Sequence, residues 1–345
     1  MLATRSADFA PLPTIRAVSV KALRQWCAPE VILVVTNLAD EMVILPHAIQ
    51  QARQSRAKIV LAHVVAPEKA VSVHHGPPHR PMSRLQEARS TVDRMARQLR
   101  WLGFTCEPLV LTGHPYSEIP LLARNCCADR VIVALDDNDE LARPRMLSHP
   151  DQLLTKLDFP TCVIGRHVSL ASSGGLLTRN VTLAVSLESD CDVPLAFACR
   201  FAQELRAKLT ILHVIGHGNR DLDPAAYSPM EIASRLPNPT WQEAQLFCPT
   251  EIEIREGEAA EEILRHGAST NQDLLLLCSS GISSFGSDWK TSVCARVLKG
   301  VQCPTFVLRK QLENPSSDDS VVEVPQKLLA CGEAIEGASL KENAI

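Results

Sequence analysis

The chain has 345 residues, a formal charge of −4 at pH 7 and an aromatic content of 4%. This length exceeds what one domain usually needs, so two domains with flanking segments are expected. The slightly acidic charge provides no overall basic field for nucleic acid, and the few aromatic side chains leave little surface for stacking bases. Nucleic acid is therefore not expected as a partner.

No stretch of the sequence approaches the roughly 18 uninterrupted apolar residues of a membrane span, and the N-terminal region lacks the pattern of a secretory signal. A cytoplasmic protein without membrane contact is expected. The 12 cysteines include no Cys-x-x-Cys pair and lie mostly in apolar runs, which is typical of buried, reduced thiols. The adjacent pair Cys126-Cys127 leaves a redox role open.

In chain order, short β-branched runs alternate with segments whose apolar residues recur at helical spacing. Strands are expected at 31–36, 59–65, 105–111, 130–135 and 161–165, and helices near 42–52, 85–99, 115–127 and 147–157. Gly103 stands where a helix-ending glycine is expected. Because neighbouring parallel strands need crossover connections, this alternation predicts a doubly wound α/β fold with a parallel five-stranded sheet.

The second part of the chain repeats this plan. Val181 to Ser186 matches Val31 to Thr36, and His213-Val214 matches His63-Val64, each 150 positions later. The later landmarks recur 144 positions on, with Gly113, Asp129 and Pro160-Thr161 matched by Gly257, Asp273 and Pro304-Thr305. Six residues are therefore missing from the second copy before Gly257. A period this long indicates two homologous domains, because solenoid repeats are only ~20 to 50 residues long.

The domain boundaries follow from the repeat and from local composition. We expect an N-terminal extension at 1–27, a first domain at 28–166, a linker at 167–179, a second domain at 180–310 and a mobile tail at 311–345. Within the tail, a short helix is expected near Gln326 to Ala330. In the second domain, Pro229, Pro237 and Pro239 are expected to shorten or split the helix that precedes its third strand.

Several short patterns occur in the same order in both copies. Each copy has His-Val near the end of its second strand, then Gly-x4-Glu-Ile at a helix start (Gly113 to Ile119, Gly257 to Ile263), an Asp before the fourth strand and Pro-Thr-x-Val at the fifth. With these features the chain resembles a tandem, two-domain member of the universal stress protein family. The resemblance implies an adenine nucleotide alpha hydrolase-like fold for each domain. It also implies that domain 1 pairs with domain 2 through their fifth strands as an internal pseudo-dimer, and it leaves a homo-oligomer or a further protein partner open.

Nucleotide-binding members of that family have an Asp at the end of the first strand and a Gly-x2-Gly-x9-Gly-Ser/Thr motif after the fourth. Glycines let backbone N–H groups approach phosphate, and the following helix offers its positive N-terminus. In the second copy the motif positions are Cys278, Gly281, Thr291 and Ser292, and Ser186 replaces the acid. The resemblance implies a site for ATP or another adenine nucleotide formed by Ser186, Val214, Leu277, Cys278, Gly281, Thr291, Ser292 and Val293. A structural turn without ligand is the alternative.

The first copy departs further from the motif. Its matching positions are Ala134, Asp137, Leu147 and Ser148, and the loop Asp136 to Glu140 carries four carboxylates, which would repel a polyphosphate. Oxygen ligands suit Mg²⁺ or Ca²⁺, but the spacing is not that of an EF-hand, so a solvated loop is favoured over a metal site.

The histidines His74, His75 and His79 lie in a Pro-rich segment without a suitably spaced Cys or carboxylate. We interpret them as loop residues, and the recurring His63 and His213 as packed imidazoles that mark the fold. No nucleophile elbow, P-loop or other catalytic motif occurs, so an enzyme is not expected. The hypotheses are a stress-response regulatory protein that binds an adenine nucleotide in domain 2, a ligand-free interaction or scaffolding module, and, less favoured, a slow ATPase.

Overall fold

The computed structural model describes residues 29–66, 81–135, 153–165, 167–168, 178–186, 192–216, 248–270, 272–279 and 292–309. Several predictions therefore lie outside the described residues. They concern the N-terminal extension, the histidine loop, most of the helix at 147–157, the acidic loop, the linker composition, the proline-split helix, Gly281, Thr291 and the C-terminal tail.

The first half contains five strands in the order β3-β2-β1-β4-β5, with parallel pairing throughout. This is the order expected for a doubly wound sheet, in which the chain turns back at the first strand. Its elements are β1 (Val31–Val35), α2 (Glu41–Ser55), β2 (Lys58–Val65), α3 (Pro81–Trp101), β3 (Cys106–Thr112), α4 (Pro115–Asn125), β4 (Arg130–Ala134) and β5 (Thr161–Ile164). The predicted strands of this half are confirmed to within one or two residues at their ends.

The second half repeats the order as β8-β7-β6-β9-β10, again with parallel neighbours. Its elements are β6 (Asn180–Val185), α6 (Asp192–Leu205), β7 (Lys208–Ile215), β8 (Thr250–Glu256), α9 (Ala259–Ser269), β9 (Leu274–Ser279), α10 (Val293–Gly300) and β10 (Thr305–Arg309). The predicted α/β class is therefore confirmed in both halves.

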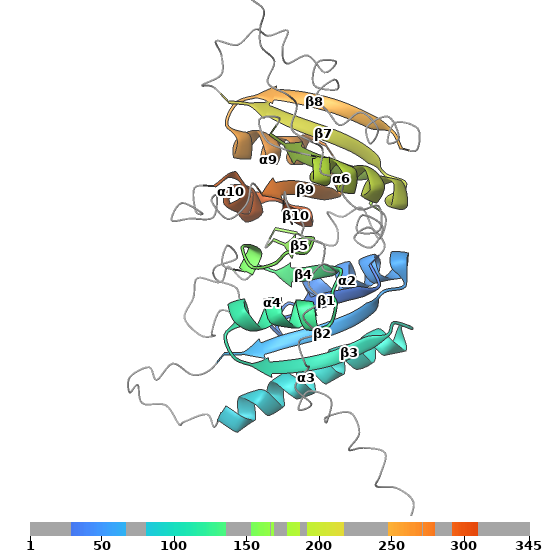
Figure 1. Ribbon diagram of the computed structural model, residues 1–345, viewed down its shortest axis with the longest axis vertical. Coiled ribbons are helices and arrows are strands. Elements are labelled where there is room, and N and C mark those ends of the chain that lie inside the picture. The colour runs from blue at the N-terminus through green and yellow to red at the C-terminus, as the bar shows by residue number, and fades with distance from the viewer. Residues whose placement is uncertain are drawn as a thin grey trace, which may run out of the picture. The chain divides into compact units, whose positions relative to one another are not determined.

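The two fifth strands join the halves into one ten-stranded sheet (Figure 1). β5 and β10 are antiparallel, with Cys162 opposite Phe306 at the centre of the pairing. This antiparallel step reverses the sheet, so the strand order of one half mirrors that of the other. An internal pseudo-dimer that pairs through its fifth strands, as the family resemblance implied, has this antiparallel arrangement of β5 and β10.

Apolar side chains cover both faces of the sheet. Alternate residues of β1 show the division, because Ile32 and Val34 belong to one core cluster and Leu33 and Val35 to another. The first cluster includes residues of α2, α3 and α6 and thus extends through both halves. On the other face α4 packs in the first half, and α9 and α10 cover the second. This shared core makes the two halves one packed body.

The recurring Gly-x4-Glu pattern has a packing origin. Gly113 and Gly257 have φ angles of 151° and 150°, a region that favours glycine. A Cβ atom at Gly113 would lie 2.6 Å from Oε1 of Glu118, and one at Gly257 would lie 2.9 Å from Cγ of Glu262. Each glycine thus gives room to the glutamate five positions later, so the pattern marks a turn before a helix and needs no ligand.

The recurring aspartates connect the fourth strand to the start of the first. The carboxylate of Asp129 accepts hydrogen bonds from the N–H groups of Glu30 and Val31, at 2.7 and 3.0 Å. Asp273 does the same for Arg179 and Asn180, at 2.7 and 2.9 Å. These bonds satisfy strand-end donors, which explains why an Asp stands at this position in each copy.

Candidate functional site at the carboxyl end of the second sheet

The carboxyl ends of β6, β7 and β9 lie side by side, because β6 pairs in parallel with both neighbours. The register places Val185 beside His213 and Ala184 beside Leu277. Ser186, Val214 and Cys278, each one residue further along its strand, therefore end at the same edge of the sheet. Ligands of open α/β sheets bind at this edge.

The described site residues differ in accessibility. Ser186 is exposed, Val214 and Cys278 are partly buried, and Leu277 is buried with 4% of its surface exposed. Leu277 belongs to the apolar core on the α9 and α10 side of the sheet. Of the expected site residues, Ser186, Val214 and Cys278 can thus contact a ligand. Leu277 instead packs in the apolar core beneath the sheet edge.

Helix α10 begins beside this edge. Ser292 is its N-cap, with extended backbone angles, and its hydroxyl accepts a hydrogen bond from the N–H of Ala295 at 3.2 Å. Val293, the first helical residue, has 38% of its surface exposed. The helix end is therefore capped by its own serine, and it directs its remaining N–H groups and positive dipole end outward.

The same edge of the first half is closed by its own side chains. The hydroxyl of Thr36 is fully buried and donates to Asp40 at 2.5 Å, and the other carboxylate oxygen of Asp40 accepts from the N–H of Asn37 at 3.2 Å. Leu38, at φ 73°, completes the tight loop. Asn37, which corresponds to Ser186 in the strand register, thus belongs to a self-contained turn.

The recurring histidines connect strand ends. Nδ1 of His63 lies 2.8 Å from the carbonyl oxygen of Thr36, and Nδ1 of His213 lies 3.1 Å from that of Val185. Burial lowers the pKa of His63, which favours the neutral ring. The interpretation of both residues as packed, hydrogen-bonded imidazoles is confirmed.

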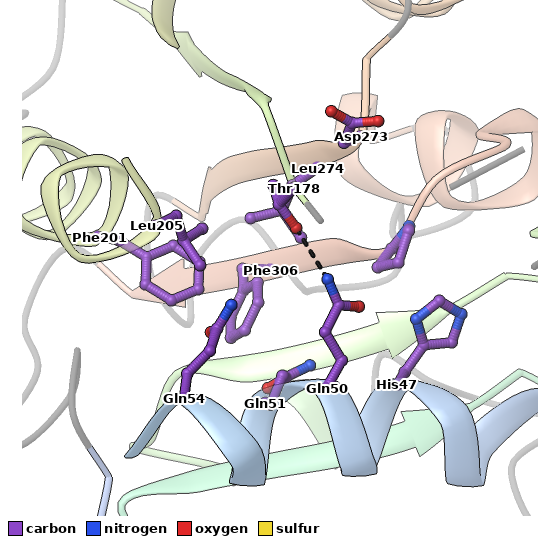
Figure 2. Close-up of a pocket in the computed structure, with 11 residues that line it drawn as sticks. His47, Gln50, Gln51, Gln54, Thr178, Phe201, Leu205, Asp273, Leu274 and Phe306 are labelled. Carbon is purple, nitrogen blue, oxygen red and sulfur yellow. Dashed lines mark hydrogen bonds between the residues drawn. The ribbon is translucent and has the colours of Figure 1, made fainter. Parts of the chain in front are cut away.

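A cavity at the junction of the halves is too small for a nucleotide. His47, Gln50, Gln51 and Gln54 of α2 line this cavity from the first half, and Phe201, Leu205 and Phe306 line it from the second (Figure 2). Its volume is about 20 Å³. Such a volume holds about one water molecule. This cavity is therefore a feature of the interface.

Sequence reasoning missed the polar residue at the centre of this junction. Arg130 is 1% exposed and donates to Gln51 at 3.0 Å. Its guanidinium carbon lies 5.1 Å from the ring centroid of Phe201 and 5.0 Å from that of Phe306, both in the second half. The signal available in the sequence is a lone arginine at the start of a buried strand, where the second copy has Leu274.

A second missed group is a Thr-His-Glu arrangement. Nε2 of His266 lies 3.1 Å from the hydroxyl of Thr182, and Nδ1 lies 3.1 Å from a carboxylate oxygen of Glu253. The order matches nucleophile, base and acid in a catalytic triad. However, Thr182 and His266 are 2% and 1% exposed. A substrate has no access to this hydroxyl, so the group connects α9 to the sheet.

The adjacent cysteines lie directly after α4, which ends at Asn125 and not at Cys127 as expected. Burial raises the pKa of Cys126 to about 11, whereas Cys127 is exposed. A raised pKa lowers the thiolate fraction and with it the reactivity of Cys126. Among the described residues no group of His, Cys, Asp and Glu could hold a metal ion, and no described helix is long and apolar enough to cross a membrane.

The model of the universal stress protein family matches residues 30–165 and again residues 178–309. The chain belongs to the universal stress protein family. Two matches in one chain make it a tandem member, so the resemblance inferred from the recurring motifs is confirmed. No curated protein matches this universal stress protein.

Solved structures share its fold over both halves. A universal stress protein from Archaeoglobus fulgidus DSM 4304 has a TM-score of 0.61 at 15% identity, and the match covers 81% of this chain and 96% of that one. A putative universal stress protein from Pseudomonas aeruginosa UCBPP-PA14 has a TM-score of 0.52 at 16% identity, with 82% and 94% covered. At these identities the structural likeness concerns the fold alone.

Proposed function

We propose that this tandem universal stress protein is a regulatory binding protein whose second half takes an adenine nucleotide. The ligand would lie at the carboxyl ends of β6, β7 and β9, next to the N-terminus of α10. The first half would act as a structural partner. No catalytic step is assigned to either half.

The observation that carries this proposal is the contrast between the two equivalent edges. In the first half Asn37, which is in register with Ser186, is half-buried and its N–H donates to Asp40 at 3.2 Å, whereas Ser186 is exposed. Partly exposed Cys278 and the N-terminus of α10 lie at the same edge. Backbone N–H groups at a helix start favour the negative charge of a phosphate.

A ligand-free interaction module is the second candidate. It is favoured by Cys278 at the first glycine position of the motif, because a side chain there reduces the space for close approach of a phosphate. The two candidates make opposite predictions for the effect of nucleotide on stability.

The test is isothermal titration calorimetry together with thermal unfolding, using Mg-ATP and the full chain. At 100 times its dissociation constant a ligand stabilises the native state by about 2.7 kcal/mol. Gly281→Val should abolish this gain by blocking the phosphate-binding loop. Asn37→Ala, at the closed edge of the first half, should preserve it.

Each alternative outcome has a clear meaning. No stabilisation of the wild type by ATP, ADP or AMP would refute nucleotide binding and leave the interaction module. Equal stabilisation of wild type and Gly281→Val would place the ligand elsewhere. Release of ADP from ATP by the wild type but not by Gly281→Val would contradict the non-enzymatic assignment.

A further inference from the structure

A wide apolar groove of about 640 Å³ runs between α2 and α3 of the first half, away from the candidate nucleotide site. Buried Leu45 and Leu99 lie at its floor. Its sides carry the exposed residues Met42, Trp101 and Leu102, with exposed fractions of 77%, 86% and 49%. Large apolar side chains gathered on a surface are typical of interaction sites.

The duplication provides an internal reference for this groove. In the second half the position that corresponds to Met42 is Asp192, the first residue of α6. The position that corresponds to Ile49 is Cys199, which is 3% exposed and belongs to the core. The fold therefore does not require an apolar residue at position 42.

The rim of the groove is positively charged. Arg94 donates two hydrogen bonds to Glu41, at 2.9 and 2.7 Å, so these two charges neutralise each other. Arg97 is exposed on the groove and makes no hydrogen bond or ion pair to the residues that the structure describes. The balance at the rim thus attracts acidic groups.

We propose that the α2–α3 groove binds an amphipathic helix of a partner protein, with an apolar stripe on the groove floor and acidic residues facing Arg97. Two adjacent helices with an apolar furrow between them are the usual receptor for a third helix. The aromatic Trp101 at the edge is the kind of residue that dominates binding energy in such interfaces.

The charge and the shape of the groove select this occupant. In a symmetric contact, a second copy of the chain would bring Arg97 against the Arg97 of that copy, which is unfavourable. A membrane surface would meet Trp101 and Met42 but leave the concave floor at Leu45 and Leu99 unfilled. A helix can fill the floor and neutralise the rim together.

The test uses a fluorescein-labelled synthetic peptide of about 18 residues, long enough to form a helix, with leucines on one face and glutamates along both flanks. A second peptide carries lysines in place of the glutamates. Fluorescence anisotropy measures the affinity of the full chain for each. The variants are Trp101→Ala and Arg97→Glu. The matched control is Leu121→Ala, which truncates a residue that is 50% exposed on α4.

Trp101→Ala should weaken binding of the acidic peptide about tenfold or more. Arg97→Glu should weaken binding of the acidic peptide and strengthen that of the basic one, and Leu121→Ala should change neither. Circular dichroism and melting temperature establish that the variants are folded. The proposal is overturned if the wild type does not bind the acidic peptide, or if Arg97→Glu leaves the preference between the peptides unchanged. It is likewise overturned if Trp101 acts in self-association or in binding to phosphatidylserine vesicles and not in peptide binding.

Discussion

His47 is a buried titratable residue at the junction of the two halves. It is 3% exposed and lies on α2 at the edge of the small cavity, and burial lowers its pKa to about 4. Its counterpart in the second half is Phe197, which is fully buried. At neutral pH the ring of His47 is therefore uncharged and packs as an apolar group would.

This burial predicts a loss of stability in acid. The unfolded chain takes up a proton at His47 below its ordinary pKa near 6.5, whereas the folded chain does so only near 4. The free energy of unfolding should therefore fall between these values, by at most about 3 kcal/mol from this residue. Urea unfolding of wild type and His47→Gln at several pH values measures the difference. His47→Gln should lose less stability in acid, and His114→Gln, an exposed control, should behave as wild type; equal pH dependence in all three would refute the assignment.

For single residues, the sequence predicted which positions recur in both copies better than it predicted what their side chains do. The recurrence of Asp129 as Asp273 is visible in one sequence, and so is the spacing of the glycines. The roles depend on neighbours distant in sequence, because Asp129 bonds to amides 98 and 99 positions earlier. Gly281 and Thr291, two of the eight predicted site residues, lie outside the described residues.

The contact between α9 and its sheet shows how one element changed between the copies. In the second half, this contact between helix and sheet includes the polar side chains of Thr182, Glu253 and His266. The corresponding residues of the first half are Leu33, Leu109 and Leu122, which are all apolar. The same helix-on-sheet contact is thus built once from apolar side chains and once with buried hydrogen bonds.

We predict that the apolar version can replace the polar one. His266→Leu alone should lower the free energy of unfolding by about 1–3 kcal/mol, because the hydroxyl of Thr182 then remains buried without its ring partner. Adding Thr182→Leu should recover most of this loss, since replacing all partners of a buried polar pair is often neutral. Glu253 retains Arg255, whose Nε lies 2.5 Å from its carboxylate. Urea unfolding of both variants measures these changes. A double variant as unstable as the single one would show that the fold requires the polar network.

The order and type of the elements could be predicted because the hydrophobic period is local. β-branched runs such as Val31 to Val35 and helical spacing from Glu41 to Ser55 are visible without tertiary information. The change from apolar to polar packing under α9 could not be predicted from the sequence. A histidine such as His266 on an amphipathic helix is typical of a surface position, and only the neighbouring strands β6 and β8 show that it is buried. Its burial is a product of topology.

The whole molecule depends on an asymmetric junction. β5 and β10 continue one sheet through both halves, and Arg130 from the first half lies on Phe201 and Phe306 of the second. The two rings also contact each other at a centroid distance of 5.2 Å. The pairing of fifth strands was implied by the family resemblance, whereas this cation–π contact joins residues far apart in sequence and leaves no periodic signal.

Removal of this contact should uncouple the two halves. Arg130→Ala deletes a fully buried side chain, its hydrogen bond to Gln51 and both cation–π contacts, so a loss of about 2–5 kcal/mol in the free energy of unfolding is expected. Because the halves share a core, the wild type should unfold in one calorimetric transition, and the variant should show a broadened or divided one. Arg124→Ala, which removes an exposed arginine paired with Asp158 at 3.0 Å, is the control and should change stability by less than about 1 kcal/mol. If Arg130→Ala unfolds as cooperatively as Arg124→Ala, the backbone pairing of β5 with β10 and the surrounding apolar core are sufficient to couple the halves.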